Sequence, residues 1–275
     1  MPDLADPTIS SISRGDLRIH TFTAPDDFLA DSTHVLETDG ALVVIDGQFV
    51  APYAIAFRRF VDAFDKPIRK LYLSHAHVDH WFGLSTAFPD VPVWAAEATI
   101  EELRHTAESE RAARRMQYGP MVPDAVVMPQ HVAEPGHDTV DGVDYHVDVV
   151  RNAECGAQLV ITLPGHGVTI AQDLVYSGTH VYVTRDAANT VALLRIMATS
   201  GSDVFLAGHG PIADSAEVLH NADYLAFAEQ RLAHDDPDSF REALLAAYPQ
   251  RRCPQLLDIF VPRLFESSTV EVGGR

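Results

Sequence analysis

The chain is poor in cysteine and in basic residues. Its 275 residues include only two cysteines, Cys155 and Cys253. This count excludes a scaffold built on many disulfides and is typical of a reducing compartment. Lysine and arginine number 20 against 39 aspartate and glutamate residues, which gives a formal charge of −19. Such a chain repels nucleic acid and anionic membranes on average, so we expect neither as a partner, and the charge argues against a nuclease.

An export signal and long apolar runs are missing as well. The first residues, MPDLADPTIS, lack the basic start and apolar stretch of a signal peptide. No run approaches the roughly 18 apolar residues that a membrane span requires. We therefore expect a cytoplasmic protein. A chain of this length can bury a full-sized core without disulfides, and we expect a single domain over residues 1–275.

The spacing of apolar residues predicts a mixed α/β order. Strands are expected at 17–24, 33–39, 41–46, 68–74, 91–96, 143–150, 158–163, 168–176 and 203–208. Helices are expected at 51–66, from about 79, at 101–117, at 189–200 and through most of the chain from about 213 to 265. A loop is expected at 121–141 and a loose tail from about 266. Strands and helices thus occur twice in similar order, which favours two sheet-and-helix halves within one domain.

The stretch SHAHVDHWFG, residues 74–83, comes at the end of a buried strand. His75 and His77 project to the same side of an extended segment because side chains alternate along it. A helix that begins near Asp79 turns Asp79 and His80 toward a second point close by. Imidazoles and carboxylates are ligands of Zn²⁺ and similar ions, and four of them at fixed offsets rarely occur without a shared role. The stretch therefore predicts a site for two metal ions.

The pattern HxHxDH at 75–80, followed by Gly83, resembles the signature of the metallo-β-lactamase-fold superfamily. The resemblance extends over about 33–211. It implies an α/β fold of the αββα type, in which two facing mixed β-sheets are flanked by helices and the metals lie at one edge. The resemblance further implies a metal-dependent hydrolase.

Three other segments resemble elements of this family. ALVVIDG resembles the early strand that ends in a supporting aspartate, here Asp46. AQDLVY resembles the strand whose aspartate bridges two metals, here Asp173, with Gln172 where the family usually has glycine. LAGHG resembles the late Gly-His-Gly element, here His209. The resemblance thus implies that Asp46 supports the site and that Asp173 and His209 are ligands.

One ligand of the family pattern, a histidine that precedes the bridging aspartate, has no obvious counterpart. His166 in LPGHG is the first candidate, but it lies in the turn between two predicted strands, seven residues from Asp173. At about 3.3 Å per residue, this puts it roughly 23 Å from the metal end of the strands. We therefore expect His166 to be a surface turn residue.

The loop NAECGA, before the strand at 158–163, offers the replacement. The family's spacing puts Glu154 at the position of the missing histidine, and a carboxylate can bind Zn²⁺ together with His75 and His77. Cys155 is the neighbouring alternative. The family implies two Zn²⁺ per chain, but two histidines and a carboxylate also form the facial triad of non-haem iron sites. Iron and manganese are therefore alternative ions.

Tyr176, His180 and His34 are candidates for contact with the substrate. Tyr176 lies three residues after Asp173, where lactone-hydrolysing members of the family carry a tyrosine that can donate to the substrate carbonyl. His180 follows Asp173 closely, and His34 lies in a segment that could border the site. Ordinary packing is an alternative for all three, since titratable residues matter for function only when they converge in a cleft.

The expected function is hydrolysis of a small molecule. Two ions about 3.5–4 Å apart share a water, lower its pKa and polarise the carbonyl that the metal-bridged hydroxide attacks. Asp79 is expected to bind the second ion and to handle the proton, and Tyr176 to stabilise the oxyanion. A cyclic ester or amide is the expected substrate, a lactone ahead of a β-lactam.

Two other functions remain open from the sequence. Glu154 favours a mononuclear non-haem iron dioxygenase of the same fold, although one metal would not need all of the other ligands. A catalytically silent metal-binding protein is the second alternative. The apolar positions in 224–233 and 256–265 could serve a homodimer or a core equally well.

Overall fold

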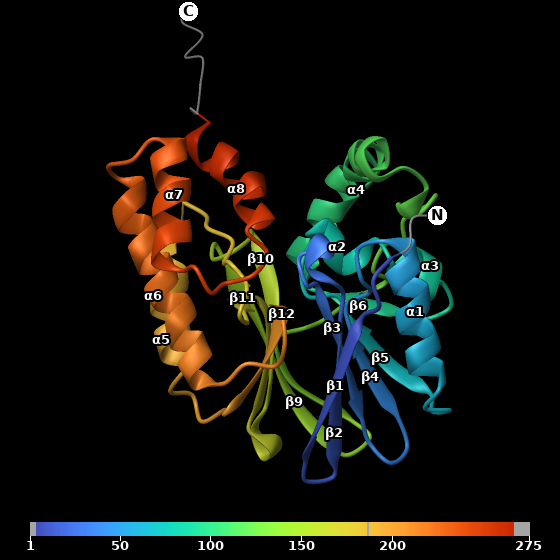
Figure 1. Cartoon of the computed structure of the whole chain (residues 1–275). Coiled ribbons are helices and arrows are strands. Elements are labelled where there is room, and N and C mark those ends of the chain that lie inside the picture. The colour runs from blue at the N-terminus through green and yellow to red at the C-terminus, as the bar shows by residue number, and fades with distance from the viewer. Residues whose placement is uncertain (1–3, 186, 267–275) are drawn as a thin grey trace, which may run out of the picture.

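The computed structural model describes residues 4–185 and 187–266. Two β-sheets lie side by side in the middle of the molecule, and helices cover the outer face of each (Figure 1). The predicted αββα sandwich of two mixed sheets is therefore confirmed. The tail predicted from about 266 lies, beyond Glu266, outside the described residues.

The first sheet has seven strands within the described residues, ordered as they occur along the chain. They are β1 (Thr8–Arg14), β2 (Leu17–Thr23), β3 (Ser32–Glu37), β4 (Leu42–Ile45), β5 (Ile68–Tyr72), β6 (Val93–Ala95) and β7 (His131–Val132). The strands from β1 to β4 pair antiparallel, and those from β4 to β7 pair parallel. The parallel connections carry helices, namely α1 (Ala51–Asp62), α2 (Val78–Trp81), α3 (Leu84–Ala87) and α4 (Glu97–Tyr118). Such crossovers cover the outer face of the sheet.

The second sheet has the order β12-β11-β10-β9-β8. Its strands are β8 (Gly136–Val140), β9 (Val143–Arg151), β10 (Ala157–Leu163), β11 (Val168–Tyr176) and β12 (Val204–His209). Only the pair β11 and β12 is parallel, and α5 (Ala187–Met197) lies in the connection between them. The remaining α-helices of the described residues are α6 (Ser215–Leu232), α7 (Pro237–Ala247) and α8 (Gln255–Phe265).

Three layers of apolar side chains hold the sandwich together. One lies between the sheets, where Ile45 and Tyr72 of the first sheet share a cluster with Tyr145 and Leu159 of the second. A second lies between the first sheet and its helices, and a third between the second sheet and α5 to α8. Strands covered on both faces read as continuous apolar runs, which is why LVVI of β4 is buried at every position.

The strands that the sequence analysis missed are polar and lie at the edges of the sheets. The segment TISSISR forms β1, yet it is mostly exposed and offers little apolar pattern. The predicted loop at 121–141 contains β7 and β8, of which GHDTV in β8 is mainly polar. Pairing with an inner strand, rather than burial of side chains, makes these segments strands.

Most apolar positions in 224–233 and 256–265 serve the core. Tyr224, Leu225, Leu257 and Phe260 are buried in the cluster beneath the second sheet's helices. These four side chains are therefore core residues, whereas Ile259 is 36% exposed, and the homodimer stays a prediction. Among the described residues, no helix combines the length and the apolar character needed to cross a membrane.

Candidate metal centre

Asp46 lies at the centre of the polar contacts where β4 and β5 end. The two strands are parallel, so their carboxyl ends reach the same edge of the sheet. The backbone N–H and the hydroxyl of Ser74 each donate to one carboxylate oxygen of Asp46 at 2.7 Å. His80 Nδ1 lies 2.9 Å from Asp46 Oδ2. A proton on Nδ1 leaves Nε2 of His80 with a free lone pair, which is the arrangement of a metal-binding histidine.

A close approach of two loops fixes the end of α2, which carries Asp79 and His80. A Cβ atom at Gly83 would lie 2.1 Å from the carbonyl oxygen of Gly47, so only glycine fits there. Trp81 is fully buried in the core beneath α2. The segment SHAHVDHWFG therefore combines apolar residues that pack in the core with polar residues that face the candidate metal site.

An irregularity in the sheet changes the direction in which Asp173 of β11 projects. The pairing register of β11 and β12 shifts on both sides of Gln172, and Gln172 has a φ of 42°. Such bulges turn a side chain toward a new direction. The left-handed φ is a conformation that glycine adopts more readily, consistent with the glycine usual in the family. Here the amide of Gln172 donates to Asp46 Oδ2 at 2.5 Å, and the adjacent Asp173 is turned to the sheet edge.

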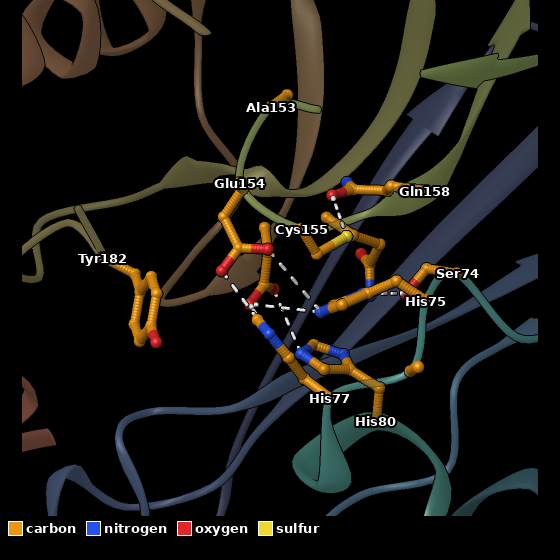
Figure 2. A network of polar contacts seen from close by, with 12 residues as sticks. Ser74, His75, His77, His80, Ala153, Glu154, Cys155, Gln158 and Tyr182 are labelled. Carbon is orange, nitrogen blue, oxygen red and sulfur yellow. Dashed lines mark hydrogen bonds and ion pairs between the residues drawn. The ribbon is translucent and has the colours of Figure 1, made fainter. Parts of the chain in front are cut away.

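The first ligand cluster contains His75, His77, Glu154 and Asp173. His77 Nδ1 lies 3.4 Å from Glu154 Oε1, and His75 Nε2 lies 3.6 Å from Asp173 Oδ2. Figure 2 shows Glu154 and the two histidines pointing toward one another from separate loops. Atoms that share one Zn²⁺ at about 2.0–2.2 Å in a tetrahedron lie about 3.4 Å apart. The spacing of this cluster therefore suits a single cation.

The second ligand cluster contains Asp79, His80 and His209. His209 Nε2 lies 3.6 Å from Asp79 Oδ2, and His80 Nε2 lies 4.0 Å from Asp79 Oδ1. Asp173 adjoins both clusters, because its Oδ1 lies 3.0 Å from His80 and its Oδ2 lies 3.3 Å from His209. One carboxylate between two clusters is the arrangement that a bridging ligand needs.

Buried polar atoms without partners test whether a cation fits. Within the described residues, no hydrogen bond reaches Nε2 of His75 or His80, either carboxylate oxygen of Glu154, or Oδ1 of Asp173. Buried polar groups are normally satisfied, and leaving them unpaired is costly. All of these atoms face the clusters, and all are metal-ligand types. The residues present therefore fit divalent cations.

Burial and mutual charge shift the pKa values of the ligands. Burial lowers the pKa of His75, and the neighbouring His80 adds to this effect. For His77 and His209 burial also acts downward, but nearby carboxylates outweigh it and raise each pKa to about 9. Glu154 has the strongest upward effect on the pKa of His77, and Asp173 has the strongest upward effect on the pKa of His209. Burial raises the pKa of Glu154 itself. Without a cation the site therefore holds protons.

Glu154, and not Cys155, is part of the first cluster. Glu154 is 4% exposed and lies in the loop before β10. The thiol of Cys155 instead donates to the carbonyl of Ala157 at 3.3 Å. His166 lies in the turn between β10 and β11, as predicted, and its Nε2 lies 2.9 Å from Asp16 Oδ1. It is at the opposite end of β10 from Glu154.

Two predicted substrate contacts lie outside the site. His34 is fully buried between the sheets, with Nδ1 2.9 Å from Thr21 Oγ1 and Nε2 2.9 Å from the carbonyl of Ala207. His180 is 1% exposed, and its Nδ1 lies 3.0 Å from the hydroxyl of Tyr224. Neither lines the cavity beside the clusters. We therefore correct the prediction for both, because their ring nitrogens are engaged in packing contacts.

A cavity of about 550 Å³ opens beside the clusters. His77, Asp79, Asp173 and His209 line its floor, and Tyr176 lies next to them. The Tyr176 hydroxyl donates to Asp173 Oδ2 at 2.9 Å, and its ring stacks on His209 with centroids 4.8 Å apart. Tyr176 is therefore within reach of a group bound at the clusters.

Tyr182 is a cavity residue that the sequence analysis missed. Its ring lies 5.7 Å from that of His77, and its hydroxyl accepts a hydrogen bond from Arg263 of α8 at 3.1 Å. Figure 2 shows it facing His77 from the side. No local pattern marks Tyr182, because its position depends on how α8 folds over the second sheet. Ser74 was also missed, although a hydroxyl directly before the HxH pattern is a signal that could have found it.

The comparisons with known proteins agree with this geometry. The profile of the metallo-beta-lactamase superfamily matches residues 26–209. The metallo-beta-lactamase from Pontibacter korlensis superposes with a TM-score of 0.59 at 17% identity, covering 80% of this chain and 99% of that one. FIM-1 from Pseudomonas aeruginosa in its mono-zinc form gives 0.59 at 15% identity, with 83% and 98% covered.

A sulfatase also shares the fold. A variant of the sec-alkyl sulfatase PisA1, an enzyme from Pseudomonas sp., superposes with a TM-score of 0.65 at 19% identity. The match covers 94% of this chain and 50% of the sulfatase, so this chain spans about half of that protein. No curated protein sequence matches the chain.

The fold and the two clusters define a metal-binding protein of the αββα class. The profile match extends over more than half of the sequence, and the chain belongs to the metallo-beta-lactamase superfamily.

Proposed function

We propose that the protein is a metal-dependent hydrolase that acts on a small ester, with a cyclic ester as the first choice. The observation that carries this proposal is the convergence of seven ligand side chains in two clusters that share Asp173 and open into one cavity. The first cluster would hold one cation through His75, His77 and Glu154, and the second would hold another through three more side chains, namely Asp79, His80 and His209. Zn²⁺ suits these ligands best, with Mn²⁺ and Fe²⁺ as alternatives.

Divalent cations at these positions supply Lewis-acid polarisation of the carbonyl and make a water acidic enough to react near neutral pH. The chain's own residues then have separate tasks. Asp79 is 17% exposed at the cavity floor and can accept a proton from the attacking water. The Tyr176 hydroxyl donates to Asp173 in the substrate-free chain. By turning from that carboxylate it can donate to the oxygen on which negative charge develops. Asp46 keeps His80 in the orientation that presents Nε2.

The cavity walls favour an apolar part in the substrate. Phe28, Phe49 and Tyr118 contribute to the wall near α4, and Leu256 and Ile259 to the wall on α8. Apolar walls of this kind are typical of small-molecule sites. Charged side chains such as Glu102 and Arg114 also line this cavity. A lactone with an apolar substituent combines a carbonyl for the clusters with surface for these walls, and ranks ahead of a β-lactam.

A sulfate ester is the second candidate. Arg263 lines the cavity and donates to Tyr182 beside His77, so a cationic group is available for an anionic substrate. The likeness to the sec-alkyl sulfatase extends over 94% of this chain, against 80% for the Pontibacter enzyme. A mononuclear iron dioxygenase is less favoured, because the second cluster would then have no role.

Metal quantification combined with a hydrolysis screen tests the proposal. Protein purified without added ions, then loaded with Zn²⁺ or Mn²⁺, is assayed on lactones, β-lactams, aryl and alkyl sulfates, thioesters and phosphodiesters. We expect two cations per chain and turnover of at least one ester class. One iron per chain and no hydrolysis of any of these substrates would overturn it.

The role of Tyr176 is tested by Tyr176→Phe, with Tyr182→Phe as the matched control of a cavity tyrosine farther from Asp173. Removal of a donor to the developing charge should lower kcat roughly 100-fold while metal content is unchanged. A kcat within about twofold of the unmodified enzyme would show that Tyr176 only packs against His209.

A further inference from the structure

The segment that precedes β3 has an unusual backbone. Leu29 and Ala30 have φ values of 62° and 53°, so two consecutive residues with side chains adopt the left-handed conformation. This conformation is uncommon for residues other than glycine, asparagine and aspartate, and it persists only where the surroundings hold it in place. Strain of this kind is concentrated at functional sites.

The contacts of this segment are directed at the end of β12. The carbonyl of Leu29 accepts a hydrogen bond from His209 Nδ1 at 3.0 Å, and the carbonyl of Ala30 accepts one from the N–H of Gly210 at 2.8 Å. Asp31 forms an antiparallel bridge with His209. The left-handed turn therefore presents two carbonyls and one acidic residue to the part of the chain that carries a ligand of the second cluster.

The carboxylate of Asp31 is buried and unpaired. Asp31 is 0% exposed, and neither of its carboxylate oxygens has a hydrogen-bond partner in the described part of the chain. Its backbone, by contrast, is held firmly, because its carbonyl accepts from both Ala24 N–H and Gln48 Nε2. Burying an ionised acid without a partner is costly, and burial accordingly raises the pKa of Asp31 well above its usual range. A positive charge nearby favours the ionised form.

The pairing of Asp31 with His209 indicates on which face of the chain the Asp31 carboxylate lies. Residues directly opposite each other in an antiparallel pair project their side chains to the same face. Asp31 therefore projects to the same face as His209, whose Nε2 points at Asp79 and Asp173. The charged groups that act most strongly on Asp31 are His80, Asp79 and His209, which together make up that cluster.

We propose that Asp31 is a positioning residue of the metal centre, whose negative charge strengthens cation binding at the Asp79–His80–His209 cluster. Asp31 belongs to neither ligand cluster and does not line the cavity. It thus acts on the cation by its charge, and on His209 through the bridge between the two backbones. This inference rests on the proposed function, because it requires that the clusters bind cations.

The test is Asp31→Asn, which removes the charge and keeps the shape. Metal-free protein is titrated with Zn²⁺ in competition with a chelator, which yields two dissociation constants. Partners that support a ligand without binding metal typically change affinity by about 10 to 100-fold. We expect Asp31→Asn to weaken the binding of one cation only, by at least about tenfold, and to leave the other dissociation constant unchanged.

Asp65→Asn is the matched control. Asp65 is an exposed residue that follows the C-terminal end of α1, far from the clusters. Both dissociation constants of that control should equal those of the unmodified protein. Dissociation constants for Asp31→Asn within twofold of the unmodified values would overturn the inference. If Asp31→Asn does not fold, Asp31→Ser removes the same charge, and the two Zn²⁺ dissociation constants of that variant decide the test. Failure of the unmodified protein to bind any cation would instead overturn the proposed function.

Discussion

Glu154 is the proposed ligand at which this chain departs from the expected pattern. It carries the most direct prediction at the scale of single residues. Removing a partner that merely orients a ligand lowers metal affinity by about 10 to 100-fold, so loss of a ligand should cost more. We expect Glu154→Ala to lose the cation of the first cluster, with affinity reduced more than about 100-fold, and Glu154→His to retain it. Chelator competition measures both.

Cys155→Ser is the matched control for that prediction. The thiol of Cys155 donates to a backbone carbonyl and lies outside both clusters. A serine hydroxyl can make the same contact, so metal affinity should not change. If Cys155→Ser lost the metal and Glu154→Ala kept it, the assignment of the first cluster would be wrong.

The histidines of the site predict a pH dependence. Burial acts to lower the pKa of His77 and of His209, but Glu154 and Asp173 outweigh it and raise each pKa to about 9. Below that value the metal-free site holds protons that a cation must displace. We therefore expect metal binding at pH 7.5 to release protons, and the affinity to rise as the pH increases toward 9. Titration calorimetry in two buffers of different ionisation enthalpy measures this release; equal heats would contradict it.

The convergence of candidate ligands was predictable from sequence where they share a local pattern. His75, His77 and His80 follow one strand at short offsets, so their convergence depends on local geometry alone. Asp31 offers no comparable signal, because only the bridge to His209, far away in the sequence, gives it a role. His34 was misjudged for the opposite reason: its position near the site in sequence says nothing about the partners that engage its ring.

At the scale of elements, the close approach of β11 and β12 positions Asp173, the proposed bridging carboxylate. A Cβ atom at Gly208 would lie 1.9 Å from Asp173 Oδ1, whereas a Cβ at Gly165 would meet nothing within 4 Å. We expect Gly208→Ala to displace Asp173 and to weaken both cations by at least about tenfold. Gly165→Ala is the matched control and should bind metal normally. Normal metal content in Gly208→Ala would show that Asp173 is not needed as a bridge.

The inner strands were predictable because buried strands have apolar side chains at successive positions. The edge strands lack this pattern and were not predictable. VTIAQDLVY is buried along its whole length in β11, whereas TISSISR in β1 is mainly exposed. Pairing of β1 with β2 comes from backbone hydrogen bonds, which any sequence without proline can make. The bulge at Gln172 was equally hidden, since it arises from the shifted register against β12.

At the scale of the whole molecule, cations should stabilise the fold. The ligands come from both sheets, so a bound ion joins the two halves of the sandwich that Figure 1 shows. Binding at a free concentration of 100 times the dissociation constant adds about 2.7 kcal/mol to the free energy of unfolding for each site. We expect a chelator to lower the Tm of the loaded protein, and Glu154→Ala to show a smaller decrease. A Tm that is insensitive to the chelator would contradict this linkage between the halves.

Diffraction from crystals grown with Zn²⁺ or Mn²⁺, collected at the absorption edge of the metal, tests the central claim most directly. The account predicts two anomalous peaks on either side of Asp173, one against His75, His77 and Glu154, and the other against Asp79, His80 and His209. A sheet edge without anomalous signal, or a peak against His166 in place of Glu154, would contradict it.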